Sequence, residues 1–197
     1  MTTTDYDLPS RADDLRGQLQ TALEPGERVL WTGFPRQGIA FSSQDVFMIP
    51  FSLMWGGFAI FWEATAFSSD KAPLFVKLWG VPFVLIGLYI IFGRFFADAA
   101  TRARTIYALT DRRVLILGGL WKTSIRSLEL AGLSEINLTE GQNGRGTIVF
   151  GPPSPFGSSP RGWPMSSRNQ SASFYGIPGA RSVLTQIRDA QRKLRAA

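Results

Sequence analysis

Two long apolar stretches stand next to each other in the middle of this sequence and limit what the chain can fold into. Residues 46–67 contain one charged side chain, Glu63, and residues 73–97 contain only Lys77 and Arg94. At about 1.5 Å rise per residue, either stretch reaches as a helix across the roughly 30 Å hydrocarbon layer of a membrane. The sequence therefore predicts two transmembrane helices.

The residues around these stretches predict how the pair is oriented. The link at residues 68–72 is short and polar, so the two helices form an antiparallel hairpin whose ends lie on one side of the membrane. Arginines crowd around those ends, whereas the link contains only Lys71. Because basic residues favour the cytoplasmic side, we expect a multi-pass protein of the cell (inner, cytoplasmic) membrane with both termini in the cytoplasm. The flanking arginines are Arg28, Arg36, Arg94, Arg102, Arg104, Arg112 and Arg113.

A pair of helices buried in a soluble core is the alternative, since helices that are apolar all round also occur there. The flanking segments are too short to cover two helices of this length. The first 30 residues carry four aspartates and lack an apolar run after a basic start, so they do not predict a secretory signal peptide. This agrees with a cytoplasmic N-terminus.

The composition excludes most catalytic and metal-binding chemistry. The chain has no cysteine and no histidine, which removes disulfides, thiolate and imidazole metal ligands, cysteine nucleophiles and the histidine base. No motif supplies a nucleophile beside a base, a cluster of metal ligands or a phosphate-binding loop. We therefore expect a protein that is not an enzyme and that uses no cofactor and no metal.

The charge is distributed unevenly and indicates an anionic partner. Residues 98–197 carry 14 basic and 6 acidic side chains, whereas residues 1–44 carry 4 and 6. A basic domain next to membrane spans suits anionic lipid head groups. Nucleic acid suits it less, because aromatic residues do not interleave with the basic ones among the predicted strands.

Outside the apolar stretches the pattern predicts a small β domain with a helix at each end. Leucines at four-residue intervals stop at Pro25 and predict a short amphipathic helix, whose acidic polar face favours packing on the β domain over lying on the membrane. A strand follows it. Beyond the hairpin come an antiparallel meander of short strands, a long irregular loop at residues 151–173 and a basic C-terminal helix. The predicted domains are residues 1–23, 24–44, 45–97 and 98–197.

Three segments together resemble a known family. They are ERVLWTGFP at residues 27–35, YALTDRRVLI at 107–116 and GTIVFG at 146–151. They resemble the bacterial pleckstrin-homology-like (PH-like) domains of membrane proteins. The resemblance implies an α+β fold in which a transmembrane two-helix hairpin is inserted in a PH-like, partly open antiparallel β-barrel capped by a C-terminal α-helix. The loop at 151–173 is longer than this family leads us to expect.

Two pairs of opposite charges fall at matching depths in the predicted hairpin. Glu63 lies seven residues before Asp70 in the link and Lys77 seven residues after it, which predicts an intramembrane ion pair, with the alternative that both side chains reach the outer head groups. Asp45 and Arg94 match in the same way at the cytoplasmic edge, where separate interfacial anchors are the favoured interpretation over a pair.

Basic residues of the β domain supply the candidate anion contacts. Thr110, Asp111 and the two arginines after them form either a hairpin turn or a phosphate- or carboxylate-binding cluster. Arg161, in the loop with Trp163, either meets the inner leaflet or belongs to a disordered linker. The C-terminal helix either attracts anionic lipid or presents a solvated face. The candidates are Arg112, Arg113, Arg161, Arg188, Arg192 and Lys193.

These features favour a membrane-anchored binding or scaffold module over an enzyme. We expect its cytoplasmic PH-like domain to mediate protein or anionic-lipid interaction at the inner membrane face. Its partners would be membrane lipids together with a further membrane protein or a second copy of the chain, and no nucleic acid. The alternative is an accessory subunit of a larger membrane transporter or envelope complex.

Overall fold

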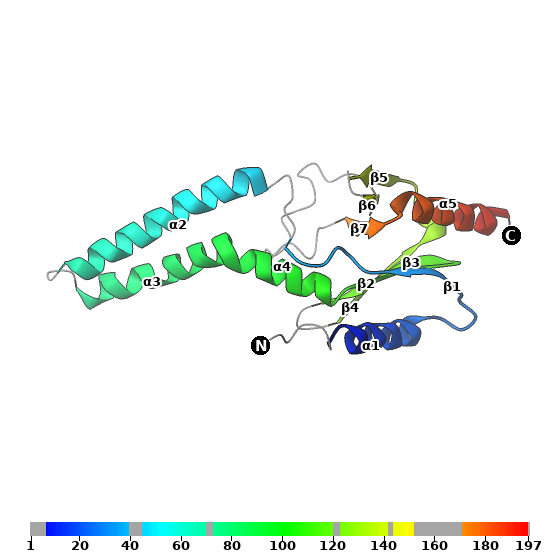
Figure 1. Ribbon diagram of the computed structural model, residues 1–197, viewed down its shortest axis with the longest axis horizontal. Helices are drawn as coiled ribbons and strands as arrows, with labels where there is room; N and C mark the ends of the chain where they lie inside the picture. The colour runs from blue at the N-terminus through cyan, green and yellow to red at the C-terminus, as the bar shows by residue number, and fades with distance from the viewer. Residues whose placement is uncertain are drawn as a thin grey trace. The chain divides into compact units, whose positions relative to one another are not determined.

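The computed structural model describes residues 7–39, 45–69, 73–119, 123–141, 144–151 and 171–196. The described residues divide into two compact units, which Figure 1 traces along the chain. We call the part between residues 39 and 98 the helical unit, and the parts on either side of it the β unit. The chain leaves the β unit after Gly38 and returns to it within one helix, α4 (Arg94–Ala103).

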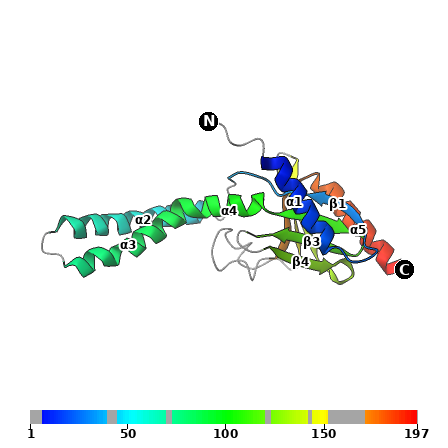
Figure 2. The ribbon, with the colours of Figure 1, turned by 90° about the horizontal axis from the view of Figure 1, so that it is seen from below.

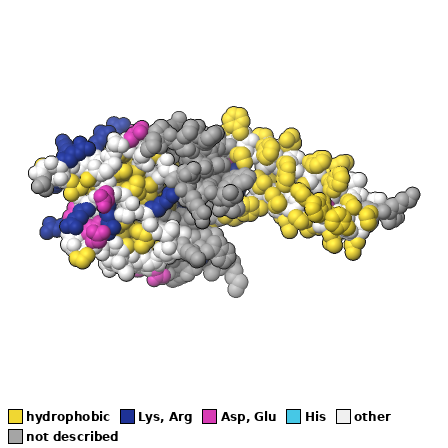
Figure 3. Space-filling view, turned by 180° about the vertical axis from the view of Figure 1, so that it is seen from behind, with side chains coloured by type: hydrophobic (Ala, Val, Ile, Leu, Met, Phe, Trp, Pro, Cys, Tyr) yellow, Lys and Arg dark blue, Asp and Glu magenta, His cyan; other side chains and the backbone are white. Residues whose placement is uncertain are grey.

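The helical unit consists of two long helices that lie side by side (Figures 1 and 2). α2 spans Asp45–Ser68, and α3 (Leu74–Leu88) continues through a π-helical turn, η1 (Tyr89–Gly93), into α4. By length and composition, both are suited to crossing a membrane. In the most apolar 18-residue stretch of each helix, only 22% and 11% is buried. Figure 3 shows hydrophobic side chains over the surface of both helices. The soluble-core alternative is therefore not supported, because a core helix buries its apolar residues.

Glycines set the distance between α2 and α3. A Cβ atom added to Gly87 would lie 3.0 Å from the Cα atom of Gly56, so the two backbones touch at this point. Small residues allow helices to approach closely in this way. Gly56 and Ala59 of α2 and Gly80 and Gly87 of α3 are all buried.

The β unit contains two antiparallel sheets with a helix at each end of its sequence. The first sheet has the order β1-β2-β3-β4 and the second the order β5-β6-β7. A short 3-10 helix, η2 (Leu130–Gly132), connects the sheets. The strands are β1 (Val29–Gly33), β2 (Ile106–Thr110), β3 (Arg113–Gly118), β4 (Ser124–Glu129), β5 (Ile136–Glu140), β6 (Arg145–Phe150) and β7 (Ala172–Pro178). The helices are α1 (Asp7–Ala22) and α5 (Ala180–Ala196).

The main hydrophobic core lies between the two sheets and α5. Phe174 of β7 is fully buried at its centre, with ring centroids 5.4 Å from Trp31, 4.8 Å from Tyr107 and 5.0 Å from Phe150. Because neighbouring residues of a strand point to opposite faces, Tyr107 and Leu109 reach this core from β2. Aromatic contacts of this kind join strands from both sheets into one domain.

The opposite face of the first sheet is covered by α1, which Figure 2 shows lying across the strands. Leu15 and Leu19 of α1 pack on Ile106 and Ala108 of β2 and on neighbouring residues of β3. Every residue of β2 is therefore buried, on one face by the main core and on the other by α1. The prediction that the first helix packs on the β domain is confirmed.

The predicted α+β class with antiparallel sheets is confirmed. Among the described strands none hydrogen-bonds across the two sheets, so they form no closed barrel, and the partly open PH-like barrel stays a prediction. The sequence also missed β7, whose first two residues fall in the predicted loop. Gly176, at φ 59°, and Pro178 resemble strand breakers, yet a register shift in the β6 partner, between Gly146 and Ile148, keeps this segment paired. Residues 152–170 of that loop lie outside the described part of the chain.

Candidate functional sites on α5 and on the α2–α3 pair

Helix α5 presents a line of arginines along one exposed flank. Its apolar residues, among them Val183, Ile187 and Ala190, are buried against the sheets. Gln191 holds the helix to η2 by donating to the carbonyl oxygens of Leu130 and Leu133, at 2.9 and 3.0 Å. Arginines at intervals of seven, four and three residues lie in one line along an exposed flank of a helix with 3.6 residues per turn. This arginine stripe consists of Arg181, Arg188, Arg192 and Arg195, all exposed.

Some of these cations already have acidic partners, while others have none. Arg181 donates to both carboxylate oxygens of Glu140 on β5, at 3.2 and 2.6 Å, and this guanidinium lowers the pKa of Glu140. Arg192 is paired with Asp189, one turn before it. Within the described part of the chain, Arg188 and Arg195 form no ion pair, and Lys193 beside the stripe forms none either. Figure 3 shows Lys and Arg side chains gathered over α5. The arrangement suits phosphate groups presented by a surface.

Arg113, the second arginine of the predicted turn cluster, is enclosed by protein acceptors. Its Nε and one terminal nitrogen donate to the two carboxylate oxygens of Glu27, at 2.9 and 2.8 Å. That nitrogen also donates to the carbonyl oxygen of Ala22 at 3.1 Å, and the other lies 3.0 Å from a carboxylate oxygen of Glu24. The hydrogen bond from Arg113 lowers the pKa of Glu27 to about 2. A guanidinium held in this way has little capacity left for an outside anion.

Thr110 and Asp111 of the same cluster stabilise the hairpin turn. The Thr110 hydroxyl donates to Glu27 at 2.7 Å and accepts the backbone N–H of Arg113 at 2.9 Å. The Asp111 carboxylate accepts the backbone N–H of Arg28 at 3.0 Å, which ties β1 to the turn. This geometry favours the hairpin-turn alternative for the cluster. Arg112 alone projects into solvent, without a side-chain partner in the described part of the chain, and stays a candidate anion contact. Arg161 lies outside the described residues.

In the helical unit, Asp45 and Arg94 form an ion pair. Their side chains are 2.9 Å apart and almost fully buried, at 10% and 3% exposed. Arg94 follows the π-helical turn η1, which adds a residue to one turn of helix and so changes the direction in which later side chains point. The guanidinium also stacks on the ring of Phe95, 4.5 Å from its centroid. The favoured interpretation of these residues as separate anchors was therefore wrong.

The predicted pair between Glu63 and Lys77 is not formed in this structure. Both carboxylate oxygens of Glu63 are buried, and among the described residues neither accepts a hydrogen bond. The carboxylate lies against Gly80, whose hypothetical Cβ atom would meet one of its oxygens at 1.6 Å. The Lys77 ammonium lies 6.0 Å from the ring centroid of Phe67. The reason is register: the contact between Gly56 and Gly87 sets Glu63 opposite a residue one helical turn beyond Lys77.

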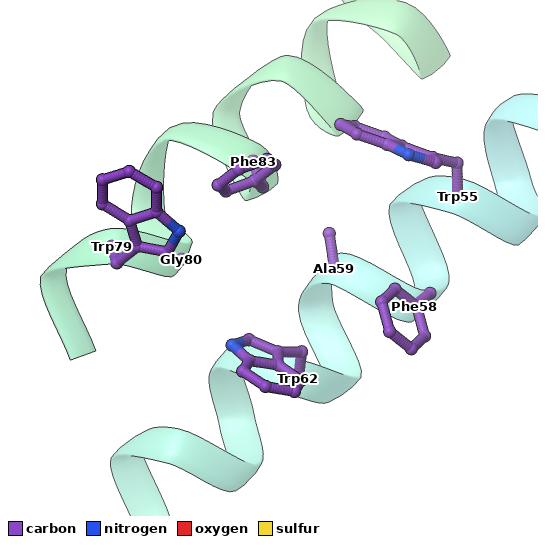
Figure 4. A pocket seen from close by; sticks show the side chains of 7 residues that line it. All are labelled: Trp55, Phe58, Ala59, Trp62, Trp79, Gly80 and Phe83. Atoms are coloured by element: carbon purple, nitrogen blue, oxygen red, sulfur yellow. The ribbon is translucent and has the colours of Figure 1, made fainter. Parts of the chain in front are cut away.

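An open cavity of about 330 Å³ lies between α2 and α3, and we call it the aromatic groove. Ala59 and Gly80, the small residues, leave its space free. Figure 4 shows aromatic rings around Ala59, whose methyl group points from α2 into the space between the helices. This site was not predicted, although the helical spacing of aromatic residues around Ala59 and Gly80 is visible in the sequence. The groove is lined by Trp55, Phe58, Ala59, Trp62, Trp79, Gly80 and Phe83.

The chain matches no protein-family model, no curated protein and no solved structure. In the described part of the chain no three Asp, Glu, His or Cys side chains are grouped so that they could hold a metal ion. The chemistry that the described residues offer is thus a cationic helix face on the β unit and an apolar groove beside a buried carboxylate on the helical unit.

Proposed function

We propose that this chain is a membrane-anchored binding or scaffold protein whose arginine stripe binds anionic lipid head groups at the cytoplasmic face. The alignment of Arg181, Arg188, Arg192 and Arg195 along one exposed flank of α5 carries the proposal. Each well-placed cation contributes about 1 kcal/mol at an anionic membrane surface. A few such contacts are enough for a domain that its own chain holds near the membrane.

In this proposal α2 and α3 cross the inner membrane as a hairpin, and the β unit is a cytoplasmic PH-like domain. The length, apolar composition and exposure of the two helices support the first part. The positions of the arginines relative to the two stretches support the orientation. Two antiparallel sheets followed by a C-terminal helix agree with the PH-like resemblance, which stays a proposal along with the orientation.

A single fluorophore on α5 tests lipid binding in the full chain. The protein has no cysteine, so Thr185→Cys places one environment-sensitive label in the arginine stripe. The chain is reconstituted in nanodiscs of phosphatidylcholine alone or with increasing phosphatidylglycerol. We expect a blue-shifted emission as the anionic fraction rises. Replacing Arg188 and Arg192 by glutamine should weaken the affinity of α5 for the anionic surface about 30-fold, because two contacts of about 1 kcal/mol are lost.

A matched control variant distinguishes an effect of the arginine stripe from an effect of net charge. Arg16→Gln with Arg28→Gln also removes two exposed cations, and Arg16 is paired with Asp13 one turn away just as Arg192 is paired with Asp189. This control should respond to phosphatidylglycerol like the parent chain. An emission that is independent of lipid charge, or an equal loss in both double variants, would remove lipid binding by the stripe.

A further inference from the structure

Along the arginine stripe, side chains held by a carboxylate of the chain alternate with side chains that have none. Arg181 donates through Nε and one terminal nitrogen to the two carboxylate oxygens of Glu140 on β5. Arg192 is paired with Asp189 of its own helix. The other two arginines of the stripe form no ion pair with a described residue. Half of the guanidinium groups that would meet a lipid surface are therefore already occupied.

These two carboxylates are open to exchange. The side chains of Glu140 and Asp189 are 41% and 47% exposed, whereas the Glu27 side chain that binds Arg113 is fully buried. Exposed ion pairs contribute little to stability, because water and salt compete for both charges. An outside anion can therefore displace the carboxylates on α5, whereas it cannot reach the guanidinium of Arg113.

A lipid phosphate and a carboxylate compete for the same donors of an arginine. The guanidinium offers its N–H groups in a fixed fork, which binds either group through two parallel hydrogen bonds. Arg181 uses this fork on Glu140. A phosphate has to break that contact before it gains the arginine, and the released carboxylate then repels the anionic surface. Both effects oppose binding, and Asp189 acts on Arg192 in the same way.

We propose that Glu140 and Asp189 restrain the arginine stripe, so that α5 binds only lipid surfaces whose anionic charge is dense enough to displace them. The two unpaired arginines make the contact at a low anionic fraction. At a higher fraction, phosphate groups replace the carboxylates on the two paired arginines. This inference rests on the lipid binding in the proposed function and adds its regulation.

The anionic lipid fraction that gives half of the response measures this restraint in the full chain. Ala196→Cys places one environment-sensitive fluorophore at an exposed position in the last turn of α5 and leaves both ion pairs in place. The chain is reconstituted in phosphatidylcholine nanodiscs with increasing phosphatidylglycerol. Asp189→Asn should lower the phosphatidylglycerol fraction at half-response about threefold, because one arginine is released and one repelling charge is lost. Glu140→Gln should have a similar effect.

A second background separates the release of an arginine from the change in net charge. In an Arg192→Gln chain, Asp189→Asn has no partner to release, and only the charge effect of about 1.5-fold should remain. Asp13→Asn is the matched control, because Asp13 is paired with Arg16 three residues later just as Asp189 is paired with Arg192. This control releases an arginine on α1 and should leave the half-response unchanged.

The possible results distinguish the restraint from lipid binding itself. If Asp189→Asn and Glu140→Gln respond like the parent chain, the carboxylates do not restrain α5. The same conclusion follows if Asp189→Asn has equal effects with and without Arg192, or if Asp13→Asn shifts the half-response as much. Each of these results overturns the inference and leaves the proposed function standing. An emission independent of phosphatidylglycerol in the parent chain and in every variant overturns both.

Discussion

Arg113 connects three parts of the β unit through a single guanidinium. It contacts Glu24 and Glu27 before β1. It also caps the end of α1 by donating to the carbonyl oxygen of Ala22, which is one of the carbonyls that a helix C-terminus leaves without an internal partner. The Glu27 side chain is fully buried in this network. Burying this carboxylate is tolerated because Arg113 and Thr110 both donate to it.

Removing the guanidinium should destabilise the β unit. Arg113→Gln leaves Glu27 buried without its cation, and we expect a loss of about 3 kcal/mol in the free energy of unfolding. Thermal unfolding of the full chain in detergent measures this as a lower midpoint. The neighbouring Arg112→Gln removes the same charge from an exposed side chain and should change stability by less than about 0.5 kcal/mol. Similar midpoints for the two variants would contradict the role assigned to Arg113.

Glu27 also predicts how stability depends on pH. Its pKa falls from 4.5 to about 2 in the folded chain, so the unfolded chain binds more protons in this range. The stabilisation is therefore complete above pH 4.5 and is lost as the pH falls from 4.5 towards 2. Unfolding midpoints measured across this window should decrease with acidity in the parent chain and decrease less in Glu27→Gln. Parallel pH profiles for the two proteins would show that Glu27 is not the responsible group.

At the level of helices and strands, the sequence predicts the elements that have a long apolar run or a strongly periodic pattern. The apolar stretch at 46–67 corresponds to α2 at Asp45–Ser68, and the C-terminal amphipathic pattern corresponds to α5. The π-helical turn η1 has no sequence signature, and it precedes Arg94 and its contact with Asp45. Depth counted from the centre of the link placed Glu63 beside Lys77, whereas glycine contacts between the helices decide the register.

The contact between α2 and α3 at their glycines can be tested directly. Gly87→Leu drives a side chain against the backbone of Gly56 and should lower the unfolding free energy by about 1–3 kcal/mol. Gly57→Leu has the same gain in helix propensity, but no atom lies within 4 Å of its new Cβ position. Loss of helical circular dichroism on heating in detergent compares the two. An equally stable Gly87 variant would show that the helices are not held at this distance.

At the scale of the whole chain, the proposed function separates anchoring from lipid binding, because the two have different physical origins. Insertion of α2 and α3 depends on apolar surface, which salt does not weaken, whereas the arginine stripe acts through charges that salt screens. The Debye length falls from about 10 Å at 0.1 M to about 3 Å at 1 M salt. The proposal therefore predicts that salt leaves membrane insertion unchanged and weakens the contact of α5 with the lipid surface.

Raising the salt concentration should separate these two events in one sample. In phosphatidylglycerol nanodiscs, the fluorophore at Thr185→Cys should return towards its phosphatidylcholine emission between 0.1 and 1 M sodium chloride, while the chain stays in the disc on size-exclusion chromatography. The Arg188→Gln, Arg192→Gln variant should already show that emission at low salt. A chain released from the disc by salt would mean that charge, and not apolar surface, holds it there. An emission unaffected by salt would contradict binding through the arginine stripe. It would mean that α5 meets the membrane through apolar contacts, although α5 exposes no large hydrophobic side chain.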